Sequence, residues 1–151
     1  MATLTVTITE SLPDYNGASN DLSTTNALAI SGITQHHHRI VTCPNSATTT
    51  IAVFNSAVSG AAGAIDTEDT RYVRVTNISD ANLTLAVVGT SDNYQVNLKA
   101  GHSHFLSATA AFLLGEADTT PAFGTLEDVA SLQVRNVSGA VKQVEILVAG
   151  V

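Results

Sequence analysis

Apolar and polar residues alternate with a period of two along most of the chain, which is the pattern of half-buried β-strands. The clearest run is near the start, where Leu4, Val6 and Ile8 alternate with threonines, and Leu28 and Ile30 mark a short strand after it. Further runs cover residues 38–43, 49–54, 71–76, 83–88, 94–98, 103–106, 132–135 and 141–148. The pattern predicts an all-β fold of about eight to ten strands, an antiparallel β-sandwich or jelly roll.

The segments between these runs have turn chemistry. Pro, Asn, Ser and Gly gather at residues 44–46, 77–80, 99–101 and 136–139, and the last two predict hairpins. Helical signals are limited to one or two short turns, the best of them at residues 125–128, where a threonine cap precedes an acid.

One internal similarity is visible. Residues 73–79 (Val-x-Val-x-Asn-Ile-Ser) match residues 132–138 (Leu-x-Val-x-Asn-Val-Ser), and a second apolar strand follows each copy. Asparagine tolerates left-handed backbone geometry and bonds its own backbone, so both copies predict a strand, an Asx turn and a strand. Convergent turn chemistry and duplication both explain the pair, and we favour convergence.

A length of 151 residues predicts a single β-sandwich domain over residues 1–151. Residues 10–25 form a polar stretch without periodicity, which predicts a loop or arm that is long for a domain of this size.

Charged residues make up only 13% of the chain, against about 25% in typical domains. Such a surface is typical either of a protein that contacts other proteins or of an ordinary neutral β protein, and we favour the first.

The charges argue against several partners. The formal charge is −7, and the six basic residues are scattered singly, whereas phosphate binding needs clusters of them. No nucleic-acid partner is expected, and no membrane partner, because no apolar run approaches about 18 residues. The start of the chain lacks the pattern of a secretory signal, and the lone Cys43 permits no intrachain disulfide. We expect assembly in a bacterial cytoplasm.

No catalytic motif is present: the chain lacks a Gly-x-Ser-x-Gly elbow, a P-loop and a Rossmann fingerprint. The candidate metal ligands are His102 with His104 and His36 with His38, because residues two apart share one face of a strand. A metal cupin needs a nearby glutamate after the first pair, and none follows before Glu116. Two histidines alone bind weakly, so no metal, cofactor or catalytic residue is expected unless histidines of several subunits meet on a symmetry axis.

Residues 71–85 (Arg-Tyr-Val-Arg-Val-Thr-Asn-Ile-Ser-Asp-Ala-Asn-Leu-Thr-Leu), 94–101 (Tyr-x-Val-x-Leu-x-Ala-Gly) and 144–146 (Val-Glu-Ile) resemble small structural proteins of tailed bacteriophages, among them cyanophages. The resemblance covers about half of the chain. It lies in the general character of the strands and turns and not in a strict motif. It implies a β-sandwich or jelly roll that decorates and cements a capsid, or a tail component, without an active site.

The sequence therefore predicts a virion structural protein: a capsid decoration or cement protein on the outside of a phage head. Its expected partners are the major capsid protein and copies of itself, as a homotrimer. Residues 10–25, 56–69 and 115–124 are the loops expected to make these contacts. The alternatives are a phage tail or receptor- or carbohydrate-binding module and, third, a cupin-like metal enzyme.

Overall fold

The computed structural model describes residues 1–13, 22–56, 63–115 and 120–151. These residues form eleven strands and no helix, so the predicted all-β class is confirmed. The helical turn expected at residues 125–128 is absent, because Glu127 instead forms a β-bridge with Leu113. The strands are β1 (Ala2–Leu12), β2 (Leu22–Ile33), β3 (Gln35–Cys43), β4 (Ala47–Asn55), β5 (Ile65–Asp66), β6 (Thr70–Asn77), β7 (Leu83–Gly89), β8 (Asn93–Leu98), β9 (Ser103–Leu106), β10 (Val129–Asn136) and β11 (Lys142–Gly150).

The chain divides into two compact units, Met1–Thr34 and Gln35–Val151. The first unit is an antiparallel two-stranded sheet of β1 and β2. The second contains the other nine strands. The expectation of a single domain over the whole chain stays a prediction, and each unit is described by itself.

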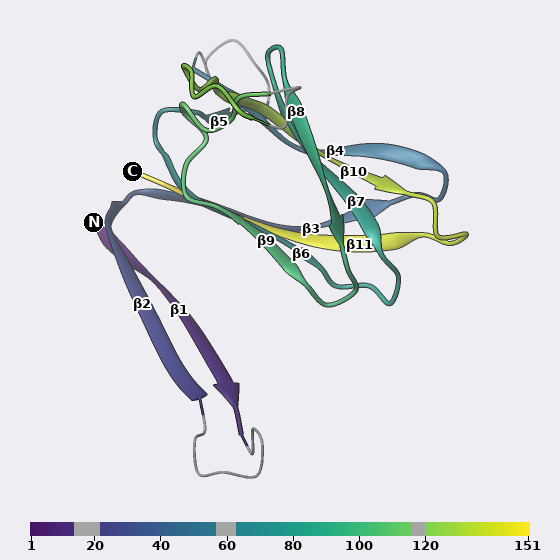
Figure 1. The fold of residues 1–151 in the computed structure, drawn as a ribbon, viewed down its shortest axis with the longest axis horizontal. Helices are drawn as coiled ribbons and strands as arrows, with labels where there is room; N and C mark the ends of the chain where they lie inside the picture. The colour runs from purple at the N-terminus through teal and green to yellow at the C-terminus, as the bar shows by residue number, and fades with distance from the viewer. Residues whose placement is uncertain (14–21, 57–62, 116–119) are drawn as a thin grey trace. The chain divides into compact units, whose positions relative to one another are not determined.

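The second unit is a β-sandwich (Figure 1). One sheet has the order β3-β11-β6-β9 and the other β5-β4-β10-β7-β8. Leaving out the two-residue β5, the first, eighth, third and sixth strands form one sheet and the second, seventh, fourth and fifth form the other. This is the strand order of a jelly roll, so the predicted architecture is confirmed.

The core follows from the alternation of side chains. In β7 every second residue from Leu83 to Gly89 is buried, and β6, β10 and β11 add their inward-facing valines, leucines and isoleucines. Leu85, Leu132 and Ile146 are at most 1% exposed. Burying each such side chain contributes about 1.5–3 kcal/mol, which holds the two sheets together.

Four short connections run from one sheet to the other, and the hairpins predicted at two of them, residues 99–101 and 136–139, are therefore wrong. Residues 44–46, 78–82, 99–102 and 137–141 each join a strand of one sheet to a strand of the other. They are arches that close over the core. Among the sandwich strands, only the connection from β7 to β8 makes a hairpin within the residues described here.

The hairpin of the first unit is longer than expected. β1 and β2 pair from Ala2 with Ile33 to Leu12 with Leu22. The predicted polar loop over residues 10–25 is therefore wrong at both ends, because residues 10–12 and 22–25 belong to the strands. These positions gave no apolar alternation because their described side chains are exposed.

Candidate functional site

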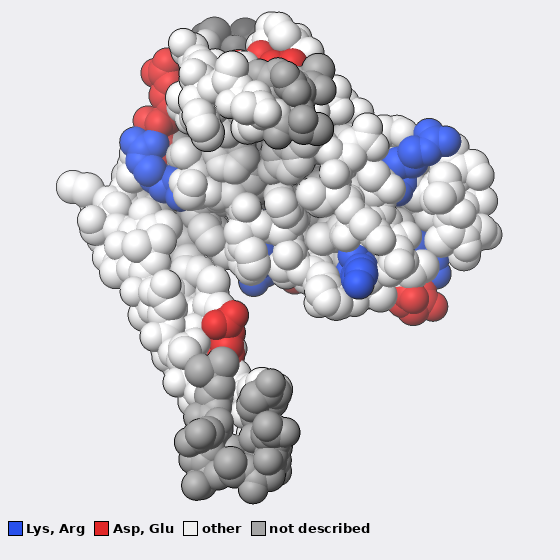
Figure 2. Space-filling view, in the orientation of Figure 1, with Lys and Arg blue, Asp and Glu red and all other residues white. Residues whose placement is uncertain are grey.

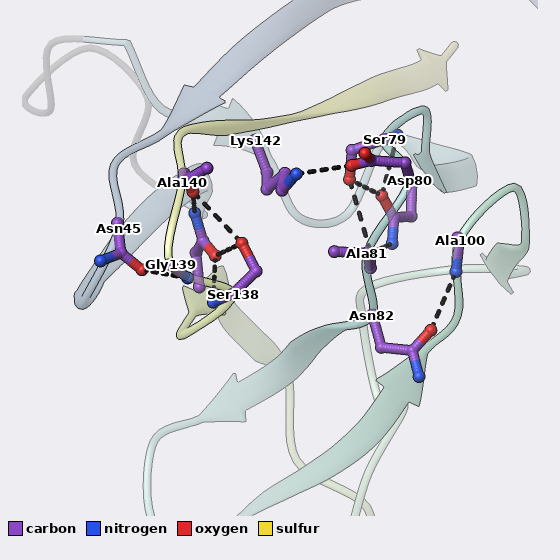
Figure 3. A network of polar contacts seen from close by, with 12 residues as sticks. Asn45, Ser79, Asp80, Ala81, Asn82, Ala100, Ser138, Gly139, Ala140 and Lys142 are labelled. Carbon is purple, nitrogen blue, oxygen red and sulfur yellow. Dashed lines mark hydrogen bonds and ion pairs between the residues drawn. The ribbon is translucent and has the colours of Figure 1, made fainter.

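The four arches of the sandwich lie together at one end, and we call residues 44–46, 78–82, 99–102 and 137–141 the arch end. Each arch follows or precedes a strand whose inner face is buried, so its ends are fixed by the core. The arches are also bonded to one another, as Figure 3 shows. The arch end is therefore a surface held in one shape by the sheets beneath it.

Asn136, the last residue of β10, ties two of these arches. Its side chain is fully buried. Nδ2 donates to the carbonyl oxygens of Cys43 and Ala140, each at 2.8 Å. Oδ1 accepts from the backbone N–H of Ser138 at 3.0 Å and from the Ser138 hydroxyl at 2.8 Å. One side chain thus satisfies four polar groups and joins the β10–β11 arch to the end of β3.

Asn77, the last residue of β6, repeats this pattern. It is also fully buried, and Nδ2 donates to the carbonyl oxygens of Leu98 at 2.9 Å and Ala81 at 2.7 Å. Oδ1 accepts from the N–H and the hydroxyl of Ser79, at 3.0 and 2.5 Å. The similarity between residues 73–79 and 132–138 therefore has a physical explanation in shared turn chemistry.

Further bonds connect the arches across the end. The N–H of Gly139 donates to Oδ1 of Asn45 at 2.8 Å, and the N–H of Ala100 donates to Oδ1 of Asn82 at 3.3 Å (Figure 3). These bonds link the arches in two pairs, residues 44–46 with 137–141 and residues 78–82 with 99–102.

An ion pair connects the arch at residues 78–82 to the strand that follows the arch at residues 137–141. Lys142, at the start of β11, places its Nζ 2.5 Å from Oδ1 of Asp80. This hydrogen bond holds the pKa of the Asp80 carboxyl below its ordinary value. A carboxyl with a lowered pKa stabilises the folded state above its unfolded pKa, and this contribution is lost as the pH falls through the folded value. The pair is therefore present at neutral pH.

Apolar side chains project from this bonded frame. Ile78 and Val137 follow the two buried asparagines, and they are 43% and 64% exposed; Val141 is 61% exposed. The arch end itself carries one acid and one base, Asp80 and Lys99, although the whole chain has a charge of −7. Rigid, neutral and apolar at its tips, this surface has the chemistry of a protein-binding site.

No family model, no curated protein and no solved structure matches this chain. Among the residues described, no helix is both long and apolar enough to cross a membrane.

The histidines of the first candidate pair do not converge. His102 lies outside the strands, and its Nδ1 is 2.9 Å from the carbonyl oxygen of Ala100. His104 lies in β9, and its Nε2 is 3.0 Å from the hydroxyl of Tyr94. Burial lowers the pKa of His104, so the neutral ring is favoured. The two rings bond to different partners and share no site.

The second candidate pair shares a face, as expected. His36 and His38 lie opposite Ala149 and Leu147 of β11. Nε2 of His38 is 3.6 Å from Oε2 of Glu145, a carboxylate that also pairs with Arg74. No group of three or more His, Cys, Asp or Glu able to hold a metal occurs in the described part of the chain.

The loops expected to contact a capsid lie partly outside the described residues, at positions 14–21, 57–62 and 116–119. In the described part of one loop, Oδ1 of Asp66 accepts from the N–H groups of Glu68 and Asp69, at 2.9 and 3.2 Å. These acids therefore build a turn.

The sequence pattern did not indicate a groove of about 370 Å³ between β8 and the loop that joins β9 to β10. Its walls are mostly apolar, and Phe123 is 99% exposed. The only sequence signal was a group of apolar residues in a segment without periodicity. The lining residues are Tyr94, Phe112, Leu113, Leu114, Pro121, Ala122, Phe123, Gly124 and Leu126.

Proposed function

We propose that this protein is a virion structural protein of a tailed bacteriophage. It acts as a decoration or cement protein that binds the outside of the capsid and stabilises it through protein–protein contacts. Its partners are the major capsid protein and further copies of itself, and it carries out no chemistry.

The observation that carries this proposal is the arch end. A binding surface loses free energy when side chains and loops must be ordered on association, and a surface that is already ordered avoids this cost. The buried asparagines Asn77 and Asn136 hold the arches, so Ile78 and Val137 are presented without a folding step. Several such contacts with neighbouring capsid subunits add up through multivalency.

The distribution of charge supports the same proposal. Few charged side chains are visible on the face in Figure 2, and most of it is neutral. The net charge of −7 and the scattered basic residues suit the outer surface of a capsid better than the inner surface that faces the nucleic acid.

The jelly roll occurs in viral capsid proteins and also in lectins and cupins, so the fold alone does not decide between these functions.

Co-sedimentation tests this proposal. The purified protein is mixed with capsids of a tailed cyanophage prepared without their decoration proteins. We expect binding that saturates at a fixed number of copies per capsid and raises the temperature at which the capsids open. If the protein binds to none of these capsids, the proposal is wrong.

A receptor- or carbohydrate-binding module of a phage tail is the second candidate. The groove near Tyr94, Phe112 and Phe123 favours it, because aromatic side chains pack on sugar rings and on apolar ligands. Binding to host cells or their surface glycans, without binding to capsids, would favour this candidate over the first.

A further inference from the structure

The groove between β8 and the loop that joins β9 to β10 is held in shape by hydrogen bonds. The N–H of Glu127 donates to the carbonyl oxygen of Leu113 at 2.7 Å, and the N–H groups of Phe112 and Leu113 donate to the carbonyl oxygen of Glu127 at 2.8 and 3.2 Å. The hydroxyl of the buried Thr109 donates to the carbonyl oxygen of Thr67 at 2.9 Å. The loop is thus ordered before any ligand binds, which lowers the cost of binding.

Apolar side chains line the groove and continue onto the surface beside it. Tyr94 and Phe112 are partly buried, whereas Phe123, Leu126 and Leu114 are 99%, 47% and 39% exposed. A volume of about 370 Å³ lies within the range of ligand pockets, about 300–1,000 Å³. Exposed apolar side chains gathered around a groove mark a binding site.

Three carboxylates, those of Asp92, Glu127 and Asp128, lie close to these walls. The Asp92 side chain lies against Gly115, because a Cβ atom at that glycine would be 2.3 Å from Oδ1 of Asp92. Oδ1 of Asp128 accepts from the N–H of Ala111 at 2.7 Å. The described lining residues include no charged side chain, so these acids set a negative field at the groove.

The groove and the arch end lie at opposite ends of the sandwich (Figure 1). β8 runs from Asn93, beside the groove, to Leu98, which precedes the arch at residues 99–102. Lys99 is the only lysine or arginine among residues 89–128, and it therefore lies away from the groove. A copy that is docked through its arch end leaves the groove free for another partner.

The charge around the groove selects a cationic partner. The carboxylates attract a positive charge, and the faces of aromatic rings attract it as well. The same carboxylates disfavour nucleic acid and anionic lipid, and they disfavour a second copy of this chain, which would bring the same acids with it. The apolar walls in turn require an apolar group next to the positive charge.

A free strand edge favours an extended peptide segment as the source of these groups. β8 is the last strand of the five-stranded sheet, and among the described strands it pairs with β7 alone. An extended segment can add to such an edge through backbone hydrogen bonds, while its side chains enter a pocket beside the edge. Tyr94 belongs to β8 and lines the groove, so the edge and the groove lie at one place.

We propose that the groove binds an extended segment of a partner protein in which apolar side chains are flanked by lysine or arginine. An apolar side chain of the segment enters the groove beside Phe112 and Phe123, and its basic side chains pair with Asp92 and Asp128. This inference goes beyond the proposed function and does not depend on it, because the groove lies at the other end of the sandwich.

Fluorescence anisotropy with a labelled peptide tests the inference. The probe is the peptide Gly-Ser-Lys-Arg-Leu-Phe-Lys-Arg-Ser-Gly, and we expect a Kd in the micromolar range. One comparison peptide has glutamate in place of each lysine and arginine, and another has serine in place of leucine and phenylalanine. Each comparison peptide should bind at least about tenfold more weakly.

Phe123→Ser should weaken binding of the probe at least about tenfold, because it removes the exposed aromatic wall of the groove. Ile40→Ser is the matched control, since Ile40 is also an exposed apolar residue, at 57%, but lies in β3. It should leave binding of the probe within a factor of about two. Unchanged unfolding temperatures show that both variants are folded.

Asp92→Asn keeps the shape of the side chain and removes its charge, so it should weaken binding of the probe about threefold. In about 1 M salt, where the Debye length is about 3 Å, this variant and the wild type should bind alike. Glu68→Gln is the matched control, because Glu68 is an exposed acid between β5 and β6. Equal losses for Glu68→Gln and Asp92→Asn would mean that the peptide responds only to the net charge, which contradicts the inference.

The inference is also wrong if the acidic peptide binds as tightly as the probe, or if Phe123→Ser binds the probe like the wild type. Binding of neutral oligosaccharides through Phe123, without binding of the probe, would replace it with the glycan-binding candidate. Peptide binding by a protein that binds no capsid contradicts the proposed function alone. Capsid binding by a protein that does not bind the probe contradicts this inference alone.

Discussion

Replacing Asn136 by alanine should destabilise the sandwich by about 2–4 kcal/mol, which corresponds to a fall of roughly 10 °C in the unfolding temperature. The Asn136 side chain is fully buried and makes four hydrogen bonds. Its loss leaves the carbonyl oxygen of Cys43 without this donor in a buried position. We expect the same effect for Asn77→Ala, since Asn77 makes the equivalent four bonds. Thermal and denaturant unfolding measure both.

Asn45→Ala is the matched control for this prediction. Asn45 is also an arch asparagine, but it is exposed and accepts a single hydrogen bond, from Gly139. Its replacement should cost less than about 1 kcal/mol. Equal losses for Asn45→Ala and Asn136→Ala would mean that the buried asparagines do not hold the arches.

Replacing Ile78 and Val137 together by aspartate should reduce capsid binding by at least about thirtyfold. Both side chains are exposed tips of the arch end, so the folded state tolerates a polar replacement there. In a bound state, however, each aspartate would have to be buried against the partner, and burying an unpaired charge is costly. Co-sedimentation with capsids gives the affinity, and circular dichroism shows whether the β spectrum is unchanged.

Val53→Asp provides the comparison. Val53 is 43% exposed, the same as Ile78, but it lies in β4, away from the arches. This substitution should leave capsid binding within a factor of about two, as is usual for surface positions outside an interface. A large loss for Val53→Asp and none for the arch-end pair would move the binding surface to the outer face of the five-stranded sheet.

The fold class was predictable because a strand with one buried face leaves its period in the sequence. Leu132, Val134 and Asn136 are all buried, and so are Val73 and Val75 before Asn77. What the period does not encode is which strand pairs with which. A short turn with Asn, Ser and Gly has the same local chemistry in a hairpin and in an arch, so the arches at residues 99–102 and 137–141 were predicted as hairpins.

One signal could have identified the arches. Each buried asparagine continues the inward-facing alternation of its strand, whereas a hairpin turn has its polar residues in solvent. A polar residue at an inward-facing position at the end of a strand indicates that the chain crosses from one sheet to the other there. The candidate site became visible only in three dimensions, because its arches come from four distant parts of the chain.

The hairpin shows a different limit of the sequence. Residues 10–12 and 22–25 form strands, but their described side chains are exposed, so nothing imposes strict alternation of apolar residues there. The helical turn expected at residues 125–128 fails for another reason. The Glu127 carboxylate accepts from the N–H groups of Ser91 and Asp92, at 3.0 and 2.8 Å, and this contact with the β7–β8 turn favours the extended backbone.

Electron cryomicroscopy of capsids saturated with this protein tests the central claim most directly. Our account predicts that the arch end of each bound sandwich, including Ile78 and Val137, faces the capsid shell. Bound copies whose groove between β8 and the β9–β10 loop faces the shell, with the arches in solvent, would contradict it.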